Sequence, residues 1–163
     1  IMGLQDSFTY DVYLSFRGED TRYGFTGNLY AALNQRGIHT FTDELTLLQG
    51  EEISSSLLHA IEKSKIAIII FSPNYASSRW CLDELTKILD CYEENKTGRL
   101  VLPVFYKVDP SNVRRCRGRF GETLAKLEDR FNHDEERVNK WRDSLRKAAS
   151  LAGFHFGYSF IFN

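Results

Sequence analysis

The run Ile66-Ala67-Ile68-Ile69-Ile70-Phe71 is apolar at every position. A strand of this kind is typical of the centre of a sheet that is covered on both faces. Three further stretches are predicted to be buried strands: Tyr10–Phe16, Ile38–Phe41 and Leu100–Tyr106. Pro103 removes a backbone donor from the last of these and indicates an edge or near-edge position.

Apolar side chains recur at helical spacing between these strands, in stripes that begin at Phe25, Ile53, Leu82 and Val138. Gly37 and Gly153 follow the first and last helices, where the left-handed conformation is expected. Residues 107–132 are expected to be irregular, with short helices. The alternation predicts an α/β domain with a parallel sheet and right-handed crossovers. A fifth strand is expected, although the residues do not show where it lies.

The bulk composition is that of one globular domain. The 163 residues are 42% apolar and 26% charged, and the net charge of −1 gives no field that would indicate a nucleic-acid partner. Residues 1–106 carry 9 basic and 14 acidic groups, whereas residues 107–152 carry 12 basic and 8 acidic groups. Two such poles favour association between copies, and the alternative is that they are ordinary solvated helix faces.

Three cysteines, Cys81, Cys91 and Cys116, occur without C-x-x-C spacing, which argues against structural zinc and a disulfide framework. Free thiols fit a reducing compartment. The four histidines have no ligand spacing, so no metal is expected. No apolar run reaches 18 residues, and the start of the chain lacks the features of a signal peptide.

Ligands of open parallel sheets bind beyond the carboxyl ends of the strands, and this rule selects four loops. They are Arg17–Arg22, Thr42–Gly50, Ser72–Trp80 and Lys107–Arg119. The first loop leads into a helix N-terminus and contains two arginines, a combination that favours a phosphate. The alternative is a polar loop with Asp20 or Thr21 as the helix N-cap.

Glu84 follows Trp80 by one helical turn, so the two side chains share a face near Cys81. A carboxylate beside an indole can hold a sugar cation or its hydroxyl groups while the ring stacks on a flat base. The alternative is that Asp83 and Glu84 are first-turn acids favoured by the helix dipole.

Several other functions are excluded by the motifs. GxSxG, GxGxxG and Walker A sequences are absent. A phosphoacceptor receiver domain needs an aspartate at the end of the third strand, where this chain has Phe71-Ser72-Pro73-Asn74.

Six ordered blocks together resemble the TIR domain of plant intracellular disease-resistance receptors, which contain nucleotide-binding and leucine-rich-repeat regions. The blocks are DVYLSFRGEDTR (Asp11–Arg22), GIHTFTDE (Gly37–Glu44), GEEI (Gly50–Ile53), AIEKSKIAIIIFSPNYASSRWCLDEL (Ala60–Leu85), LPVFYKVDPSNVR (Leu102–Arg114) and WRDSL (Trp141–Leu145). The resemblance implies a flavodoxin-like, five-stranded parallel sheet over residues 10–156. Residues 1–9 are then a disordered or extra N-terminal segment, and residues 157–163 a tail or the start of a linker.

The resemblance also implies an enzyme that cleaves the nicotinamide–ribose bond of NAD⁺, and of NADP⁺ in some members, to give ADP-ribose-type immune signals. NAD⁺ is then a substrate, and no cofactor is implied. The family pattern makes Glu84 the catalytic carboxylate. It assigns substrate binding to Phe16, Arg17, Gly18, Arg22, Ser78 and Trp80.

The same resemblance implies self-association with other TIR domains through the first and last helices and a BB loop. The BB-loop residues would be Asp43, Glu44, Gln49 and Gly50. The helix residues would be Asn28, Trp141, Arg142 and Lys147. Gln49 replaces a basic residue that is usual in the family, which puts the loop contacts and a preference for a 2′-phosphate in doubt. The implied location is the cytoplasm or the nucleus, away from membranes, and the alternative function is a non-catalytic self-association module.

Overall fold

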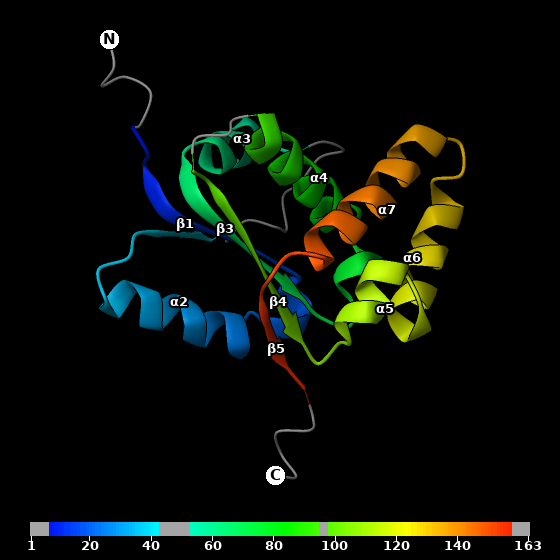
Figure 1. Cartoon of the computed structure of the whole chain (residues 1–163), viewed down its shortest axis with the longest axis horizontal. Coiled ribbons are helices and arrows are strands. Elements are labelled where there is room, and N and C mark those ends of the chain that lie inside the picture. The colour runs from blue at the N-terminus through cyan, green and yellow to red at the C-terminus, as the bar shows by residue number, and fades with distance from the viewer. Residues whose placement is uncertain (1–6, 43–52, 95–97, 158–163) are drawn as a thin grey trace.

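The computed structural model describes residues 7–42, 53–94 and 98–157. Five strands form one parallel sheet in the order β2-β1-β3-β4-β5. They are β1 (Tyr10–Phe16), β2 (Thr40–Thr42), β3 (Ser64–Phe71), β4 (Leu100–Tyr106) and β5 (Phe154–Phe156). The five-stranded parallel sheet is therefore confirmed, with the apolar run of residues 66–71 at its centre (Figure 1).

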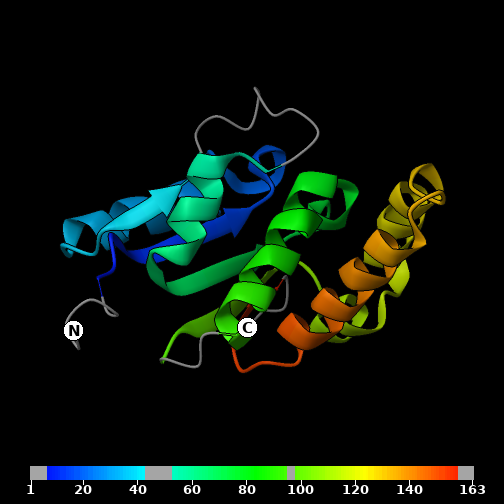
Figure 2. The same ribbon diagram turned by 90° about the horizontal axis from the view of Figure 1, so that it is seen from above.

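Helices connect the strands and cover the sheet unequally. They are α1 (Gly18–Thr21), α2 (Phe25–Gln35), α3 (Ser55–Glu62), α4 (Arg79–Glu94), α5 (Pro110–Arg115), α6 (Gly118–Arg130) and α7 (Glu135–Ala149), with a 3₁₀ turn, η3, at Tyr75–Ser77. Figures 1 and 2 show α2 on one side of the sheet and α3, α4 and α7 on the other.

Alternate residues of the strands build two separate cores, because successive side chains of a strand point to opposite faces. Tyr13, Ile69 and Phe71 belong to the larger core, which contains side chains of α3, α4, α6 and α7. Leu14 and Ile70 belong to the smaller core, which packs against α2. The sheet is thus buried on both faces along β1 and β3, as the continuous apolar run predicts.

The predicted elements differ from the structure at the edges of the sheet. Pro103 lies in β4, next to the edge strand β5, which confirms its near-edge position. The fifth strand is only three residues long, and all three are exposed, so burial gives it no pattern in the sequence. Gly37 has a φ of 75°, as expected of a residue that ends a helix in the left-handed conformation.

The expectation for Gly153 is wrong. Helix α7 ends at Ala149, and a Cβ at Gly153 would lie 2.0 Å from the carbonyl oxygen of Pro103, so glycine is needed here for close strand contact. Residues 107–132 are also more regular than expected, because α6 has 13 residues. Its buried residues Phe120, Leu124 and Leu127 have helical spacing, a signal that was present in the sequence.

Candidate active site

The candidate site lies where the carboxyl ends of β1 and β3 meet. Phe16, the last residue of β1, is in register with Ile70 of β3, so the loops that follow the two strands lie side by side. The first loop contains Arg17, Gly18 and Arg22, and the second leads through η3 into α4. This arrangement brings the arginine loop of the sequence and the start of the Glu84 helix to one edge, as the strand order requires.

Helix α4 begins at Arg79, and Ser78 stabilises its start. The Ser78 hydroxyl accepts a hydrogen bond from the Cys81 backbone N–H at 3.3 Å, and the Ser78 carbonyl accepts from Leu82 N–H at 3.2 Å. Ser78 therefore caps the helix. The helix dipole favours acidic residues in the first turn. Glu84 is the sixth residue of α4 and therefore lies beyond that turn. The explanation of Glu84 as a first-turn acid is not supported.

Glu84 is a buried carboxylate with an exposed fraction of 8%. Its side chain lies close enough to Cys81 and Tyr75 to affect their ionisation. Burial first, and the Glu84 charge second, raises the pKa of the Cys81 thiol to about 12. The pKa of Tyr75 is also raised, first by burial and then by the charges of Cys81 and Glu84. Burying a carboxylate is costly, so a buried carboxylate at the carboxyl edge of a sheet is typical of functional sites.

The side chains of the first loop are arranged around Arg22. Its guanidinium lies 5.0 Å from the centroid of the Phe16 ring. A Cβ at Gly18 would be 3.0 Å from Arg22 Nη2, so the glycine leaves space for this arginine. Arg17 is paired with Glu19 at 3.2 Å, and its side chain is 27% exposed.

The expected N-caps of this loop are not found. Helix α1 has four residues, Arg17 is at its N-cap position, and no side chain caps it. The Asp20 carboxylate accepts hydrogen bonds from Ser72 and Asn74 instead, and the Thr21 hydroxyl is 2.6 Å from that of Thr26. A single turn has little macrodipole, so an anion at this loop would depend on the two arginines.

Trp80 is partly exposed at the start of α4. The guanidinium of Arg79 lies over the Trp80 ring, 4.5 Å from its centroid, and 5.6 Å from the centroid of Phe131. One face of the indole is thus occupied by the guanidinium cation of Arg79.

A groove of about 570 Å³ lies between α3, α4 and α7, on a different face of α4 from Glu84. Asp83, Thr86 and Lys87 line it from α4, and Arg137 and Trp141 from α7. Because its lining does not include Glu84, the groove is separate from the candidate site. In the described part of the chain, no group of three His, Cys, Asp or Glu side chains could hold a metal ion. None of the described helices combines the length and the hydropathy that a membrane span requires.

The model of one protein family, the TIR domain, matches residues 9–158. The chain belongs to the TIR domain family. Disease resistance protein RPV1 of Vitis rotundifolia is 53% identical over 147 residues, which are 90% of this chain and 10% of that protein. TMV resistance protein N of Nicotiana glutinosa is 48% identical over 146 residues, 90% of this chain and 13% of that protein. The chain thus spans about a tenth of these relatives.

The fold agrees with a solved TIR structure as well. The TIR domains of the activated Roq1 resistosome, which directly recognises the pathogen effector XopQ, match this chain with a TM-score of 0.84 and 46% identity. The match covers 95% of this chain and 92% of that one. The resemblance drawn from the six sequence blocks is therefore confirmed at the level of family and fold.

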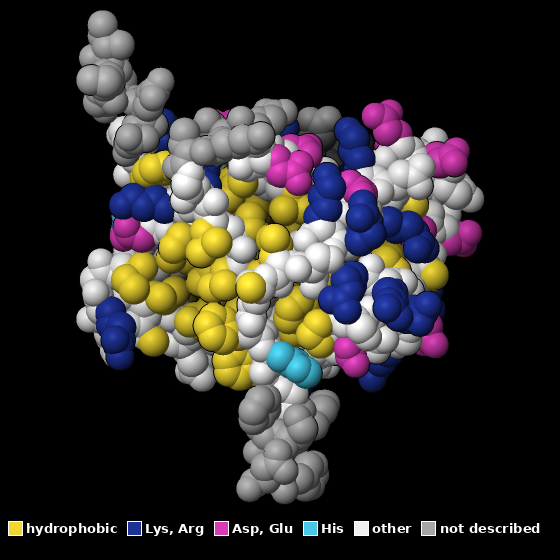
Figure 3. Space-filling view, in the orientation of Figure 1, with side chains coloured by type: hydrophobic (Ala, Val, Ile, Leu, Met, Phe, Trp, Pro, Cys, Tyr) yellow, Lys and Arg dark blue, Asp and Glu magenta, His cyan; other side chains and the backbone are white. Residues whose placement is uncertain are grey.

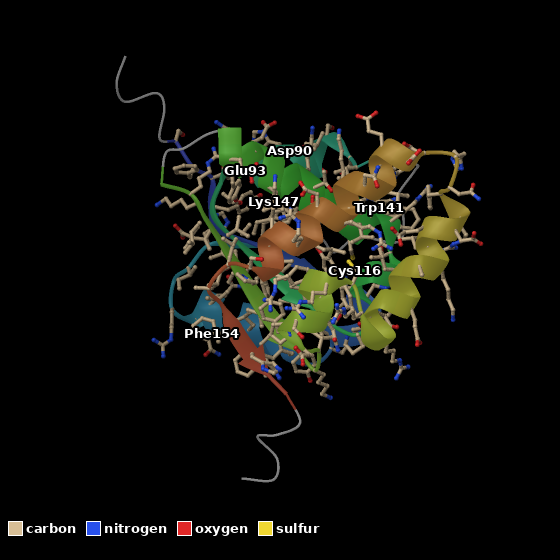
Figure 4. All side chains as sticks on the ribbon, turned by 45° about the vertical axis from the view of Figure 1, so that its right-hand side comes forward. Asp90, Glu93, Cys116, Trp141, Lys147 and Phe154 are labelled. Atoms are coloured by element: carbon tan, nitrogen blue, oxygen red, sulfur yellow. The ribbon has the colours of Figure 1, made fainter. Side chains whose placement is uncertain are left out.

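The predicted self-association residues of this TIR domain differ from one another in solvent exposure and in their contacts. Asn28 is exposed on α2. Arg142 is exposed and bonds Glu128, and Lys147 lies 3.5 Å from Glu93 of α4 (Figure 4). Trp141 has an exposed fraction of 0%, so its side chain is not on the surface of the single domain.

Trp141 is buried because its indole completes the packing of α7 on α4. The ring N–H donates to Asp83 Oδ1 at 2.7 Å. The predicted BB-loop residues Asp43, Glu44, Gln49 and Gly50 lie outside the described residues.

Two residues of the site, Asp20 and Tyr75, were missed by sequence reasoning. The sequence pattern indicates only a helix cap for Asp20 and gives no signal for Tyr75. The contacts that join Asp20 to Ser72 and Asn74, and Tyr75 to Ser15, span 52 to 60 residues of the chain, so no local pattern indicates them.

Proposed function

We propose that this TIR domain cleaves the nicotinamide–ribose bond of NAD⁺, and of NADP⁺ to an extent that Gln49 influences, to give ADP-ribose-type immune signals. The observation that carries the proposal is the Glu84 carboxylate, which is 8% exposed at the carboxyl edge of the sheet, one turn after Trp80. The names of the relatives, which are disease-resistance proteins, support the immune role.

A single carboxylate is sufficient for this reaction. Cleavage of a glycosidic bond develops an oxocarbenium-like sugar, and glycosidases use a second carboxyl group to protonate the departing oxygen. Nicotinamide is cationic in NAD⁺ and departs as a neutral molecule, so it needs no acid. The Glu84 charge would stabilise the developing cation, and preorganised groups of this kind contribute about 3–4 kcal/mol.

The other side chains of the edge would bind the remainder of the dinucleotide. Arg17 and Arg22 supply guanidinium donors for the diphosphate. Trp80 would contact the substrate from the start of α4, while Phe16 and Gly18 would shape the first-strand side of the pocket. Ser78 contributes by fixing the start of the Glu84 helix.

We further propose that the domain acts as a homo-oligomer, assembled through α2, α7 and the BB loop, residues 43–50. The similarity to TIR domains of an activated resistosome supports assembly. It also favours a second candidate function, a non-catalytic self-association module. A parent chain with nucleotide-binding and leucine-rich-repeat domains, located in the cytoplasm or nucleus, would fit the relatives, of which this chain spans about a tenth.

The experiment measures nicotinamide release from NAD⁺ by the concentrated 163-residue chain. We expect Glu84→Gln to lower the rate about 100-fold or more, because the variant removes the charge and keeps the shape. Asp90→Asn is the matched control, since Asp90 is an exposed carboxylate on the same helix. Light scattering reports self-association in parallel. An inactive wild type that still self-associates would support the non-catalytic module, and equal rates for wild type and Glu84→Gln would refute the role of Glu84.

A further inference from the structure

Asp20 joins the two loops that make the candidate site. Its Oδ2 accepts from the Ser72 hydroxyl at 2.6 Å and from the Asn74 backbone N–H at 2.8 Å. Its Oδ1 accepts from the Asn74 side-chain amide at 2.9 Å. Three donors of the loop after β3 therefore converge on one carboxylate of the loop after β1. Hydrogen bonds to an ionised acceptor are about twice as strong as neutral ones.

Asp20 lies within the arginine loop. Its backbone N–H donates to the Arg17 carbonyl at 3.0 Å, and Arg22 follows two residues later. The positions of both guanidinium groups therefore depend on how this loop is held.

The other end of the connection leads to Glu84. Asn74 precedes η3, where Tyr75 is fully buried. The Tyr75 hydroxyl lies 2.9 Å from Ser15 Oγ of β1 and donates to the Cys81 carbonyl at 3.1 Å. Cys81 Sγ in turn donates to the carbonyl of Phe16 at 3.6 Å. The residues that lead into the Glu84 helix are thus hydrogen-bonded to β1 at two points. Tyr75 contacts Ser15, and Cys81 contacts Phe16.

We propose that Asp20 is a positioning residue that sets the distance between the arginine loop and the Glu84 helix. The inference rests on the proposed function, because the two groups must contact one NAD⁺ molecule: the arginines its diphosphate, and Glu84 its nicotinamide-bearing ribose. A carboxylate suits the position because it offers acceptors to all three donors and brings no donor of its own. Asparagine would place an N–H₂ group against one or more of these donors.

The test compares Asp20→Asn with Asp11→Asn in the 163-residue chain. Asp11 is a matched control because its carboxylate also accepts from a backbone N–H, that of His39 at 2.9 Å, and lies 3.6 Å from Lys65 Nζ. It belongs to β1 near the opposite end from the site. Both variants are expected to lower the melting temperature. Only Asp20→Asn is expected to lower kcat/KM for NAD⁺, by about 10- to 100-fold, since small displacements of reacting groups have effects of this size.

Amide hydrogen exchange gives a readout that does not depend on catalysis. In Asp20→Asn, exchange should accelerate at Asn74 and at Arg22 together, while in Asp11→Asn it should accelerate only near His39. An unchanged exchange rate at Asn74 would overturn the inference. So would an active wild type with equal kcat/KM losses in the two variants. Failure of the proposed function itself is seen separately, as equal nicotinamide release by wild type and Glu84→Gln.

Discussion

The thiol of Cys81 lies three residues before Glu84 on α4, and its environment keeps it protonated. Burial and the adjacent Glu84 charge raise its pKa to about 12. Only the thiolate is a strong nucleophile, so this environment disfavours covalent chemistry by Cys81 at neutral pH. Its contacts are structural: the Sγ–H donates to the Phe16 carbonyl, which holds α4 against β1.

The same raised pKa makes stability depend on alkaline pH. The folded state holds the Cys81 proton up to about pH 12, whereas the ordinary thiol pKa is 9.0. This stabilisation is complete below pH 9 and is lost as the pH rises toward 12. Raising the pH from 8 to 10 should therefore lower the unfolding free energy of the wild type by about 1 kcal/mol through the Cys81 thiol.

Urea unfolding of wild type and Cys81→Ala at the two pH values measures this loss. The variant lacks the titrating group, so its unfolding free energy should fall less than that of the wild type. Equal losses in the two proteins would show that Cys81 is not the group responsible.

At the level of elements, α7 is fixed to α4 by a charged cluster around Asp83. The Asp83 carboxylate accepts from Trp141 Nε1 at 2.7 Å and from Arg137 Nε at 3.0 Å, and it also pairs with Arg137 Nη2. The Asp83 side chain is 17% exposed and that of Arg137 is 27% exposed. Breaking such a pair leaves a charge without its partner in a poorly solvated place.

Asp83→Asn should therefore lower the unfolding free energy by about 2–3 kcal/mol. Asp143→Asn is the control, because Asp143 pairs with Arg146 and Lys147 on the surface of α7 and is 45% exposed. Its loss should cost under about 1 kcal/mol. Chemical denaturation, followed by tryptophan fluorescence, compares the two variants, and similar losses would mean that the cluster does not hold α7.

The elements also show how much of the fold the sequence determines. Helices α2, α4 and α7 and the central strands β1 and β3 are predicted, because burial gives the helices a periodic apolar pattern and the strands a continuous one; α6 is not predicted, although its buried residues have helical spacing. Strand β5 could not be located, since its three residues are exposed and are held only by pairing with β4. Glu84 was found through its place after a strand end, whereas the bonds from Asp20 to Ser72 and Asn74 depend on tertiary contact across 52 and 54 residues.

At the scale of the whole molecule, the charges are divided between two regions. Figure 3 shows Lys and Arg side chains gathered over the side formed by α5–α7, and an apolar surface beside it. Phe154 and Phe156 of β5 are 57% and 41% exposed, and Leu100 of β4 is 51% exposed. Both features favour association between copies, and they respond to salt in opposite ways because salt screens charges and strengthens apolar contact.

The proposed assembly through α2 and α7 predicts which of these effects is stronger. If the basic surface of α7 makes the contacts, raising NaCl from about 50 mM to about 500 mM should weaken self-association, because the screening length falls severalfold. The rate of NAD⁺ cleavage per protein molecule should fall as association weakens, and at low salt it should rise with protein concentration.

Lys147→Ala should weaken association more than Lys126→Ala, which removes the same charge from α6. Light scattering and nicotinamide release, measured on the same samples, test this. Association that strengthens with salt would instead assign the contact to the exposed apolar residues of β4 and β5.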